Sequence, residues 1–140
     1  MLLSQYDLLT ETPAADEYRR LRVLAGLSPK SAEGAAIGLP NTFFAVAVRL
    51  AGDLVGMGRI VGDGGLTFQI VDIAIHPKHQ GKGLGKAIVG HLVEHLDRVA
   101  PAGAHISLLA DGSARYLYAQ FGFRPTAPAS VGMDLPLKDA

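Results

Sequence analysis

Hydrophobic and polar positions in the middle of the chain alternate as they do in β-hairpins. The stretch TFFAVAVRL at 42–50 and the stretch LVGMGRIV at 54–61 are separated by the turn AGD. A second turn, GDGG at 62–65, leads into LTFQIVDIAIH, because Asp-Gly tolerates the positive φ of tight turns. Pro77 ends this third strand, since proline has no N–H with which to continue a ladder. These residues predict an antiparallel sheet.

Apolar residues at helical spacing predict one helix before this sheet segment and a longer one after it. Thr12 and Pro13 supply an N-cap and a proline at the first helical position, and this helix should end near Gly26. Its apolar face is formed by Tyr18, Leu21 and Leu24. The longer helix carries an apolar stripe formed by Leu84, Ile88, Leu92, Leu96 and Val99. Between the first helix and the sheet, residues 31–37 form either a short helix or part of a loop.

The two ends of the chain add further strands. Residues 2–9 predict a first strand, AHISLLA at 104–110 a short buried strand, and SVGMDLPL at 130–137 a last strand. GSARYLYAQFG at 112–122 predicts a short helix between the last two strands. Elements in this order predict an α+β fold, a mostly antiparallel sheet with helices packed on its faces, in a single domain spanning residues 1–140.

Composition and charge narrow the class of protein. Among 140 residues, 49% are hydrophobic and 19% charged, which is typical of an ordinary globular domain. Thirteen Lys and Arg balance thirteen Asp and Glu, so no net charge favours nucleic acid or an anionic membrane. The chain has no cysteine, which excludes disulfides, thiolate metal sites and a cysteine nucleophile. No apolar run approaches the ~20 residues of a membrane helix, and no basic leader precedes the first residues, so a soluble cytoplasmic protein is expected.

The loop HQGKGLGK at 79–86 carries the strongest chemical signal in the sequence. Its glycines, Gly81, Gly83 and Gly85, precede the longer helix and allow successive backbone N–H groups to converge on one point. The unpaired N–H groups and the dipole of that helix favour negative charge at the same place. Lys82 and Lys86 add positive charge. The loop therefore predicts a phosphate site; the alternative is a flexible connection.

Two common phosphate motifs do not fit this loop. A dinucleotide G-x-G-x-x-G motif would need glycine at position 88 or position 86, where the chain has Ile88 and Lys86. A Walker A motif ending at Gly85-Lys86 would need glycine at Gln80 and a hydroxyl residue at Ala87. Both nucleotide templates are therefore excluded.

Two segments instead resemble the GCN5-related N-acetyltransferase (GNAT) superfamily. Gln80-Gly-Lys-Gly-Leu-Gly85 resembles the Q/R-x-x-G-x-G/A acetyl-CoA loop of that superfamily, and it lies between a strand and an amphipathic helix as it does there. Tyr118-Ala-Gln-Phe-Gly-Phe123 resembles the Y-x-x-x-G-F segment that follows the penultimate strand in many members. The resemblance covers nearly the whole chain and implies a mixed, mostly antiparallel sheet of six to seven strands, helices on both faces and splayed central strands.

The resemblance also implies a cofactor and the residues that hold it. The implied activity is transfer of an acetyl group from acetyl-CoA, as co-substrate and without a metal, to a primary amine by direct attack in a ternary complex. Main-chain groups of the strand before the loop should pair with the pantetheine arm, and the loop should hold the pyrophosphate. By position these residues are Ile73, Ala74, Ile75, Gln80, Gly81, Lys82, Gly83, Leu84, Gly85 and Lys86.

Candidate catalytic residues follow from the same comparison. Tyr118 is the candidate general acid for the departing thiolate, or else an aromatic packing residue beside Phe121 and Phe123. Asp72, an acid inside an apolar strand, is a candidate base or a hydrogen-bonded structural carboxylate. His76 is a second candidate base.

Three further polar residues have less specific roles. Arg59 and Asp63 either line the substrate side or belong only to the hairpin. Asp111 stands where many members have an asparagine that contacts the cofactor, but helix N-capping suits an aspartate better.

Two other functions remain open at this point. A non-catalytic CoA-binding or interaction module with the same fold would carry the same motifs. His91-Leu-Val-Glu94-His95 matches H-x-x-E-H, the spacing of inverted zinc peptidases, but a solvated helix face is the better explanation, since short motifs often match by accident.

The acceptor is not specified by the sequence. In the family, the first helices with their loop and the last strands build that site, here about 24–41 and 124–131 by position. A small amine, an amino acid, a polyamine, an aminoglycoside, or a protein N-terminus or lysine are all compatible with these stretches. The expected partners are a small-molecule or peptide amine acceptor and, optionally, a second copy in a homodimer, with no nucleic acid and no membrane.

Overall fold

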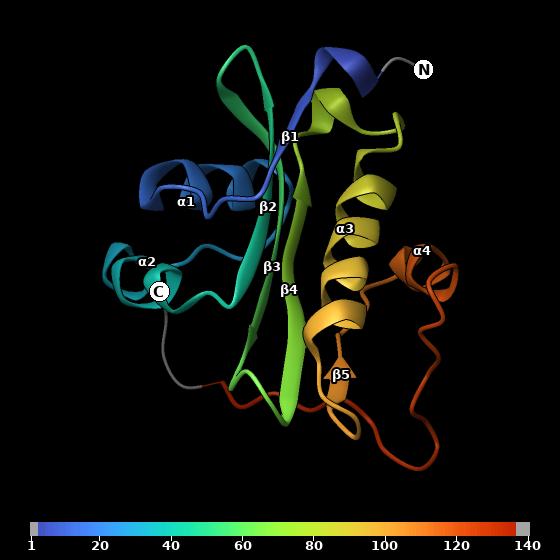
Figure 1. Ribbon diagram of the computed structural model, residues 1–140. Helices are drawn as coiled ribbons and strands as arrows, with labels where there is room; N and C mark the ends of the chain where they lie inside the picture. The colour runs from blue at the N-terminus through green and yellow to red at the C-terminus, as the bar shows by residue number, and fades with distance from the viewer. Residues whose placement is uncertain (1–2, 137–140) are drawn as a thin grey trace. The chain divides into compact units, whose positions relative to one another are not determined.

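The computed structural model describes residues 3–136 and contains one mixed sheet of five strands in the order β1-β2-β3-β4-β5 (Figure 1). Neighbouring strands are antiparallel except β4 and β5, which are parallel. The bounds are β1 Asp7–Leu9, β2 Phe44–Leu50, β3 Asp53–Gly62, β4 Thr67–Ile75 and β5 His105–Ser107. Both predicted hairpins, β2–β3 and β3–β4, are therefore confirmed.

Helices cover both faces of the sheet, with α1 and α2 on one side and α3 on the other (Figure 1). The α-helices are α1 Ala15–Leu24, α2 Ala32–Gly38, α3 Leu84–Val99 and α4 Ala114–Ala119. Short 3₁₀ turns are η1 Leu3–Gln5, η2 Leu39–Asn41 and η3 Pro77–His79. The two helices predicted from their apolar stripes are confirmed, although α1 has Ala14 and not Thr12 as its N-cap, and the stretch that was either helix or loop contains α2.

Glycines in β3 let α3 lie close to the sheet. A Cβ atom built on Gly58 would lie 2.7 Å from both Ile73 Cδ1 and Ile88 Cγ2 and 3.0 Å from Leu92 Cδ1. On the opposite face, Met57 and Ala74 pack against α1 and α2 in a cluster completed by Tyr18, Leu21, Ala35 and Leu39. The alternation of small and large residues along β3 therefore sets a close helix on one face and an ordinary core on the other.

Gly58→Ala should lower the free energy of unfolding by about 1–3 kcal/mol, because the added methyl group overpacks the interface between β3 and α3. Chemical denaturation measures this loss. Gly38→Ala in α2 is the control, since a Cβ there meets nothing within 4 Å and alanine favours a helix by about 0.5–1 kcal/mol. Equal effects of the two substitutions would contradict close packing at Gly58.

The prediction of six to seven strands is wrong, because the described residues form five. The expected last strand at 130–137 is not formed in its described part, residues 130–136. Its apolar residues are exposed, with Val131 at 66% and Met133 at 88%, so the alternating pattern has no sheet face to bury it. The expected strands at 2–9 and 104–110 shrink to Asp7–Leu9 and His105–Ser107, residue 2 lying outside the described residues.

The chain divides after Leu108 into two compact units, Met1–Leu108 and Leu109–Ala140. The first unit contains the sheet and α1 to α3, and the second contains α4. The single domain over residues 1–140 stays a prediction. Among residues 3–136, no helix combines the length and apolar character needed to cross a membrane.

Candidate active site

The open edge of β4 is the first feature of the site. Strand β5 pairs with β4 only at Thr67, Phe68 and Gln69. Among the described residues, the rest of β4, residues 70–75, has β3 as its only partner strand. The two parallel strands therefore part after Gln69, which leaves main-chain groups on that edge of β4 available to a ligand. The residues predicted to meet the pantetheine arm lie on the part of β4 that β5 does not pair with; they are Ile73, Ala74 and Ile75.

The loop after β4 turns sharply into α3. The side-chain amide of Gln80 donates a hydrogen bond to the Ile75 carbonyl at 3.1 Å, which fastens the loop to the end of the strand. Gly81 and Gly83 have φ of 75° and 85°, values that favour glycine, and Gly83 is the N-cap of α3. A Cβ atom built on either glycine would meet nothing within 4 Å. The space above both glycines is therefore open to an approaching group.

This loop suits a phosphate group chemically. The N-terminus of α3, a helix of 16 residues, presents unpaired N–H groups and the positive end of its dipole to that open space. Its first turn has no acidic residue, while Lys82 and Lys86 add positive charge. The residues of the loop from Gln80 to Lys86 therefore suit a phosphate or diphosphate group.

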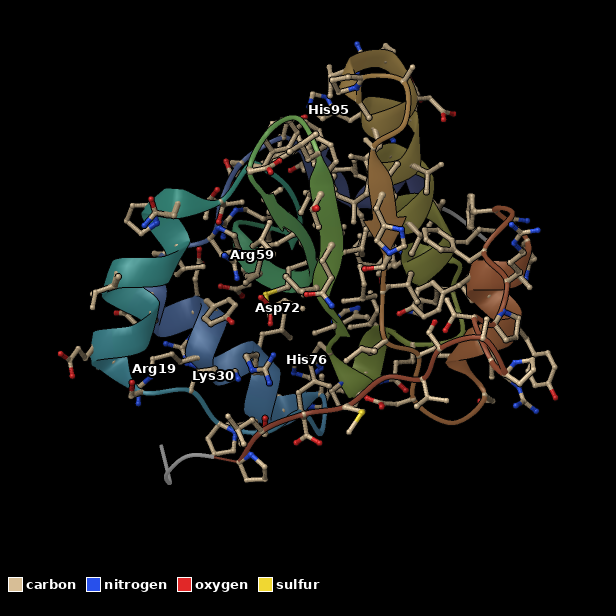
Figure 2. All side chains as sticks on the ribbon, turned by 90° about the horizontal axis from the view of Figure 1, so that it is seen from below. Arg19, Lys30, Arg59, Asp72, His76 and His95 are labelled. Atoms are coloured by element: carbon tan, nitrogen blue, oxygen red, sulfur yellow. The ribbon has the colours of Figure 1, made fainter. Side chains whose placement is uncertain are left out.

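Asp72 interrupts β4 with an unusual backbone. Its φ is 59°, in the left-handed region, and the pairing of β3 with β4 shifts register at this point. Its carboxylate lies between two guanidinium groups, with Oδ1 2.5 Å from Arg22 Nη1 and Oδ2 2.6 Å from Arg59 Nη1. Figure 2 shows Asp72 and Arg59 side by side. The three side chains are only 6–9% exposed, so this is a buried ionic cluster.

The cluster connects α1, β3 and β4 with two loops of the first unit. Arg22 from α1 also donates to the carbonyl and the hydroxyl of Ser28, in the loop between α1 and α2. Arg59 from β3 also donates to Thr42 Oγ1 at 2.9 Å, just after η2. Burial and the neighbouring Asp72 carboxylate raise the pKa of Tyr18, whose ring lies 5.8 Å from the Arg59 guanidinium carbon. Arg59 thus belongs to this cluster rather than only to the hairpin.

Tyr118 lies on α4, in the second unit. Its ring packs edge-on against Phe123 with centroids 6.3 Å apart. Burial and the charge of Asp111 raise the pKa of the Tyr118 phenol, so the hydroxyl keeps its proton at neutral pH. The N-cap of α4 is Ser113, so the interpretation of Asp111 as that cap is wrong.

A family model described as an acetyltransferase (GNAT) domain matches residues 40–125, more than half of the chain. The chain belongs to the GNAT family. GCN5-related N-acetyltransferase 2 of Arabidopsis thaliana is 36% identical over 80 residues, 57% of this chain and 30% of that protein. The uncharacterized N-acetyltransferase ycf52 of Pyropia yezoensis is 39% identical over 80 residues, 57% of this chain and 45% of that protein. The matches therefore span less than half of the length of these two relatives.

Solved structures agree with this family. A probable acetyltransferase of unknown function from Staphylococcus aureus superposes on this GNAT chain with a TM-score of 0.90 and 42% identity, covering 94% of this chain and 99% of that one. The ribosomal-protein-S18-alanine N-acetyltransferase of Escherichia coli superposes with a TM-score of 0.69 at 21% identity, covering 85% and 77%, and shares the fold alone. The solved structures thus agree with the GNAT family in fold.

The histidines of the H-x-x-E-H motif have different surroundings in the GNAT fold. His91 is exposed on α3, whereas the His95 ring stacks on Phe44 with centroids 3.7 Å apart. His95 Nδ1 is buried without a hydrogen-bond partner among the described residues, and burial lowers the pKa of this side chain. Between residues 3 and 136, no group of three or more His, Cys, Asp or Glu could hold a metal ion.

Sequence reasoning missed two sets of contacts around the site. Arg22 was not singled out, although a charged residue four positions after Tyr18 on a mainly apolar helix face is a signal of a buried ion pair. The Tyr6 hydroxyl lies 2.8 Å from His79 Nδ1 and accepts a hydrogen bond from Lys82 Nζ at 3.4 Å, which ties the chain before β1 to the glycine loop. His76, the second candidate base, accepts a hydrogen bond from the Lys78 N–H through Nδ1.

Proposed function

We propose that this GNAT domain transfers the acetyl group of acetyl-CoA to a primary amine by direct attack in a ternary complex. The observation that carries the proposal is the unpaired edge of β4 leading directly into a glycine loop that is open above Gly81 and Gly83. An extended thioester arm can pair with such an edge as an added strand. A pyrophosphate at the end of that arm then meets the N-terminus of α3.

The residues of the chain supply binding and polarisation in this proposal. Main-chain groups of Ile73, Ala74 and Ile75 orient the arm, and an N–H among them polarises the thioester carbonyl. Backbone N–H groups from Gly81 to Lys86 hold the pyrophosphate, with Lys82 and Lys86 contributing charge. Acetyl-CoA supplies the activated acyl group, and the acceptor nitrogen attacks its carbonyl carbon.

Proton transfers complete the reaction. The Tyr118 hydroxyl donates its proton to the thiolate that leaves, so free coenzyme A departs as a thiol; the proton that the attacking nitrogen loses on becoming the amide passes through water and restores the phenol. Asp72 is the candidate base from the sequence, but both its oxygens accept hydrogen bonds from guanidinium groups. We therefore assign loss of the ammonium proton to water. With no cysteine in the chain, direct transfer is favoured over a cysteine-linked acetyl intermediate.

A thiol-release assay with acetyl-CoA tests this function. The panel of acceptors should include small amines, amino acids, polyamines, aminoglycosides, and peptides with a free N-terminus or lysine. Release of coenzyme A that depends on one acceptor class, together with the matching acetylated product by mass spectrometry, supports the proposal. Calorimetry with coenzyme A separates the alternatives: binding without turnover across the panel supports a non-catalytic binding module, and the absence of binding overturns both.

A further inference from the structure

We propose that Asp72 is a positioning residue, which holds β4 in a bulge and thereby aims the main-chain groups of Ile73 at the thioester. This inference rests on the proposed acetyl transfer. Asp72 does not touch the reacting atoms in this assignment; it acts through the backbone that follows it.

The register of β3 and β4 defines the bulge. Met57 pairs with Ala74, and Arg59 pairs with Val71. Between these two pairs β3 has one residue, Gly58, whereas β4 has two, Asp72 and Ile73. Two residues opposite one is the arrangement of a β-bulge, which bends a strand and redirects the groups that follow it.

The backbone of the bulge needs an external restraint. Asp72 and Ala51 are the non-glycine residues with positive φ among residues 3–136, and Ala51 lies in the β2–β3 turn, where such values are common. Asp72 instead lies inside a strand, where the left-handed conformation is strained for a residue with a Cβ atom. Such a conformation persists only when the surroundings fix it.

The two arginines provide that restraint. Arg22 and Arg59 come from different elements, α1 and β3, and each contacts a different oxygen of the Asp72 carboxylate. Charge-assisted hydrogen bonds of this kind are strong, and a group held from two sides cannot rotate without breaking one of them. Because the cluster is only 6–9% exposed, water does not replace the lost bonds easily. The carboxylate therefore fixes the backbone of its own residue.

The restraint acts where β4 has a partner strand on one side only, as far as residues 3–136 show. Residues 70–75 pair with β3 there and not with β5, so on the open side the direction of their main-chain groups depends on the bulge. The same cluster reaches Ser28, within the 24–41 stretch expected to build the acceptor site, and Thr42, which directly follows that stretch. One carboxylate thus connects the stretch expected to build the acceptor site with the strand proposed to orient the thioester.

Asp72→Asn tests the assignment, because asparagine tolerates the left-handed conformation but cannot balance two guanidinium charges. A misplaced thioester should lower kcat by about 10- to 100-fold. The KM for acetyl-CoA should change by less than about threefold, since the glycine loop is untouched. The loss should persist from neutral pH to about pH 10, where the acceptor amine is largely unprotonated. A base would give the opposite result, a loss that disappears as pH rises.

Amide hydrogen exchange of the free protein provides a readout that does not depend on activity. In Asp72→Asn, a peptide covering β4 should exchange about tenfold faster, while peptides of α3 keep their protection. Arg49→Gln is the matched control. Arg49, on β2 and away from the bulge, also forms ion pairs with two partners, Glu11 and Glu17. It should change neither kcat nor exchange in β4.

A second variant covers the case in which Asp72→Asn does not fold. Arg22→Gln keeps one arginine opposite Asp72 and should produce the same two effects at a smaller size. The positioning role is overturned if the wild-type protein transfers acetyl groups and both variants keep its kcat and its rate of amide exchange in β4. If the wild-type protein neither binds coenzyme A nor transfers acetyl groups, the proposed function fails instead, and faster β4 exchange in the variants still shows that the cluster fixes the bulge.

Discussion

Tyr118→Phe should lower kcat by about 100- to 1,000-fold while the KM for acetyl-CoA stays within about threefold. The substitution removes only the hydroxyl that protonates the leaving thiolate and keeps the ring that packs against Phe123. Steady-state kinetics with the best acceptor measures the effect. The pH profile should agree: because the pKa of Tyr118 is raised, the phenol stays protonated and kcat should show no alkaline decline below about pH 10.

Tyr116→Phe is the matched control for this prediction. Tyr116 lies on the same helix, α4, but its side chain is 63% exposed and its hydroxyl accepts a hydrogen bond from Arg115. Its removal should leave kcat unchanged. Equal activity of the Tyr118→Phe variant and the wild-type protein would show that Tyr118 is an aromatic packing residue and that another group, or water, protonates the thiolate.

Gly83→Ala should weaken binding of coenzyme A by about 10- to 100-fold, because charge-assisted hydrogen bonds to the pyrophosphate are lost. The φ of Gly83 is 85°, which an alanine adopts with strain, and the new methyl group would stand in the open space where the phosphate should lie. Isothermal titration calorimetry with coenzyme A measures the affinity directly, without need of an acceptor.

Gly103→Ala separates backbone strain from ligand contact. Gly103 has φ of 83°, and a Cβ there also meets nothing within 4 Å, but the residue lies in the turn before β5 rather than in the glycine loop. Both variants should lose about 1 kcal/mol of stability, and only Gly83→Ala should lose affinity. A similar affinity for the two variants would mean that the loop does not hold the pyrophosphate.

The hairpins and the glycine loop could be predicted from the sequence because local chemistry determines them. The turn at Asp63 is an example: its carboxylate accepts hydrogen bonds from the N–H groups of Gly65, Leu66 and Thr67, all within four residues. The amphipathic face of α3 is likewise a local pattern. Such features need no knowledge of which distant segments meet.

The ionic cluster could not be predicted, because its parts come from distant segments. Asp72 and Arg22 are 50 residues apart in sequence, and the left-handed backbone of Asp72 occurs within a run that reads as an uninterrupted strand. The last strand was predicted wrongly because a local pattern was present without a partner for it. Residues 131–136 have the alternation of a strand, but alternation specifies only which face would be buried and not whether a neighbouring strand exists.

The glycines of β3 have a consequence for the binding loop. A Cβ atom on Gly58 would lie within 3.0 Å of Ile88 and Leu92 on α3, and the first residues of that helix are proposed to bind the pyrophosphate. Because Gly58 has no methyl group, α3 can lie close to the sheet. The residue at position 58 therefore affects the distance between the strand proposed to orient the thioester and the helix N-terminus proposed to bind the diphosphate of the same acetyl-CoA molecule. A selection for altered cofactor length should accordingly find substitutions inside this core, at positions that no ligand touches.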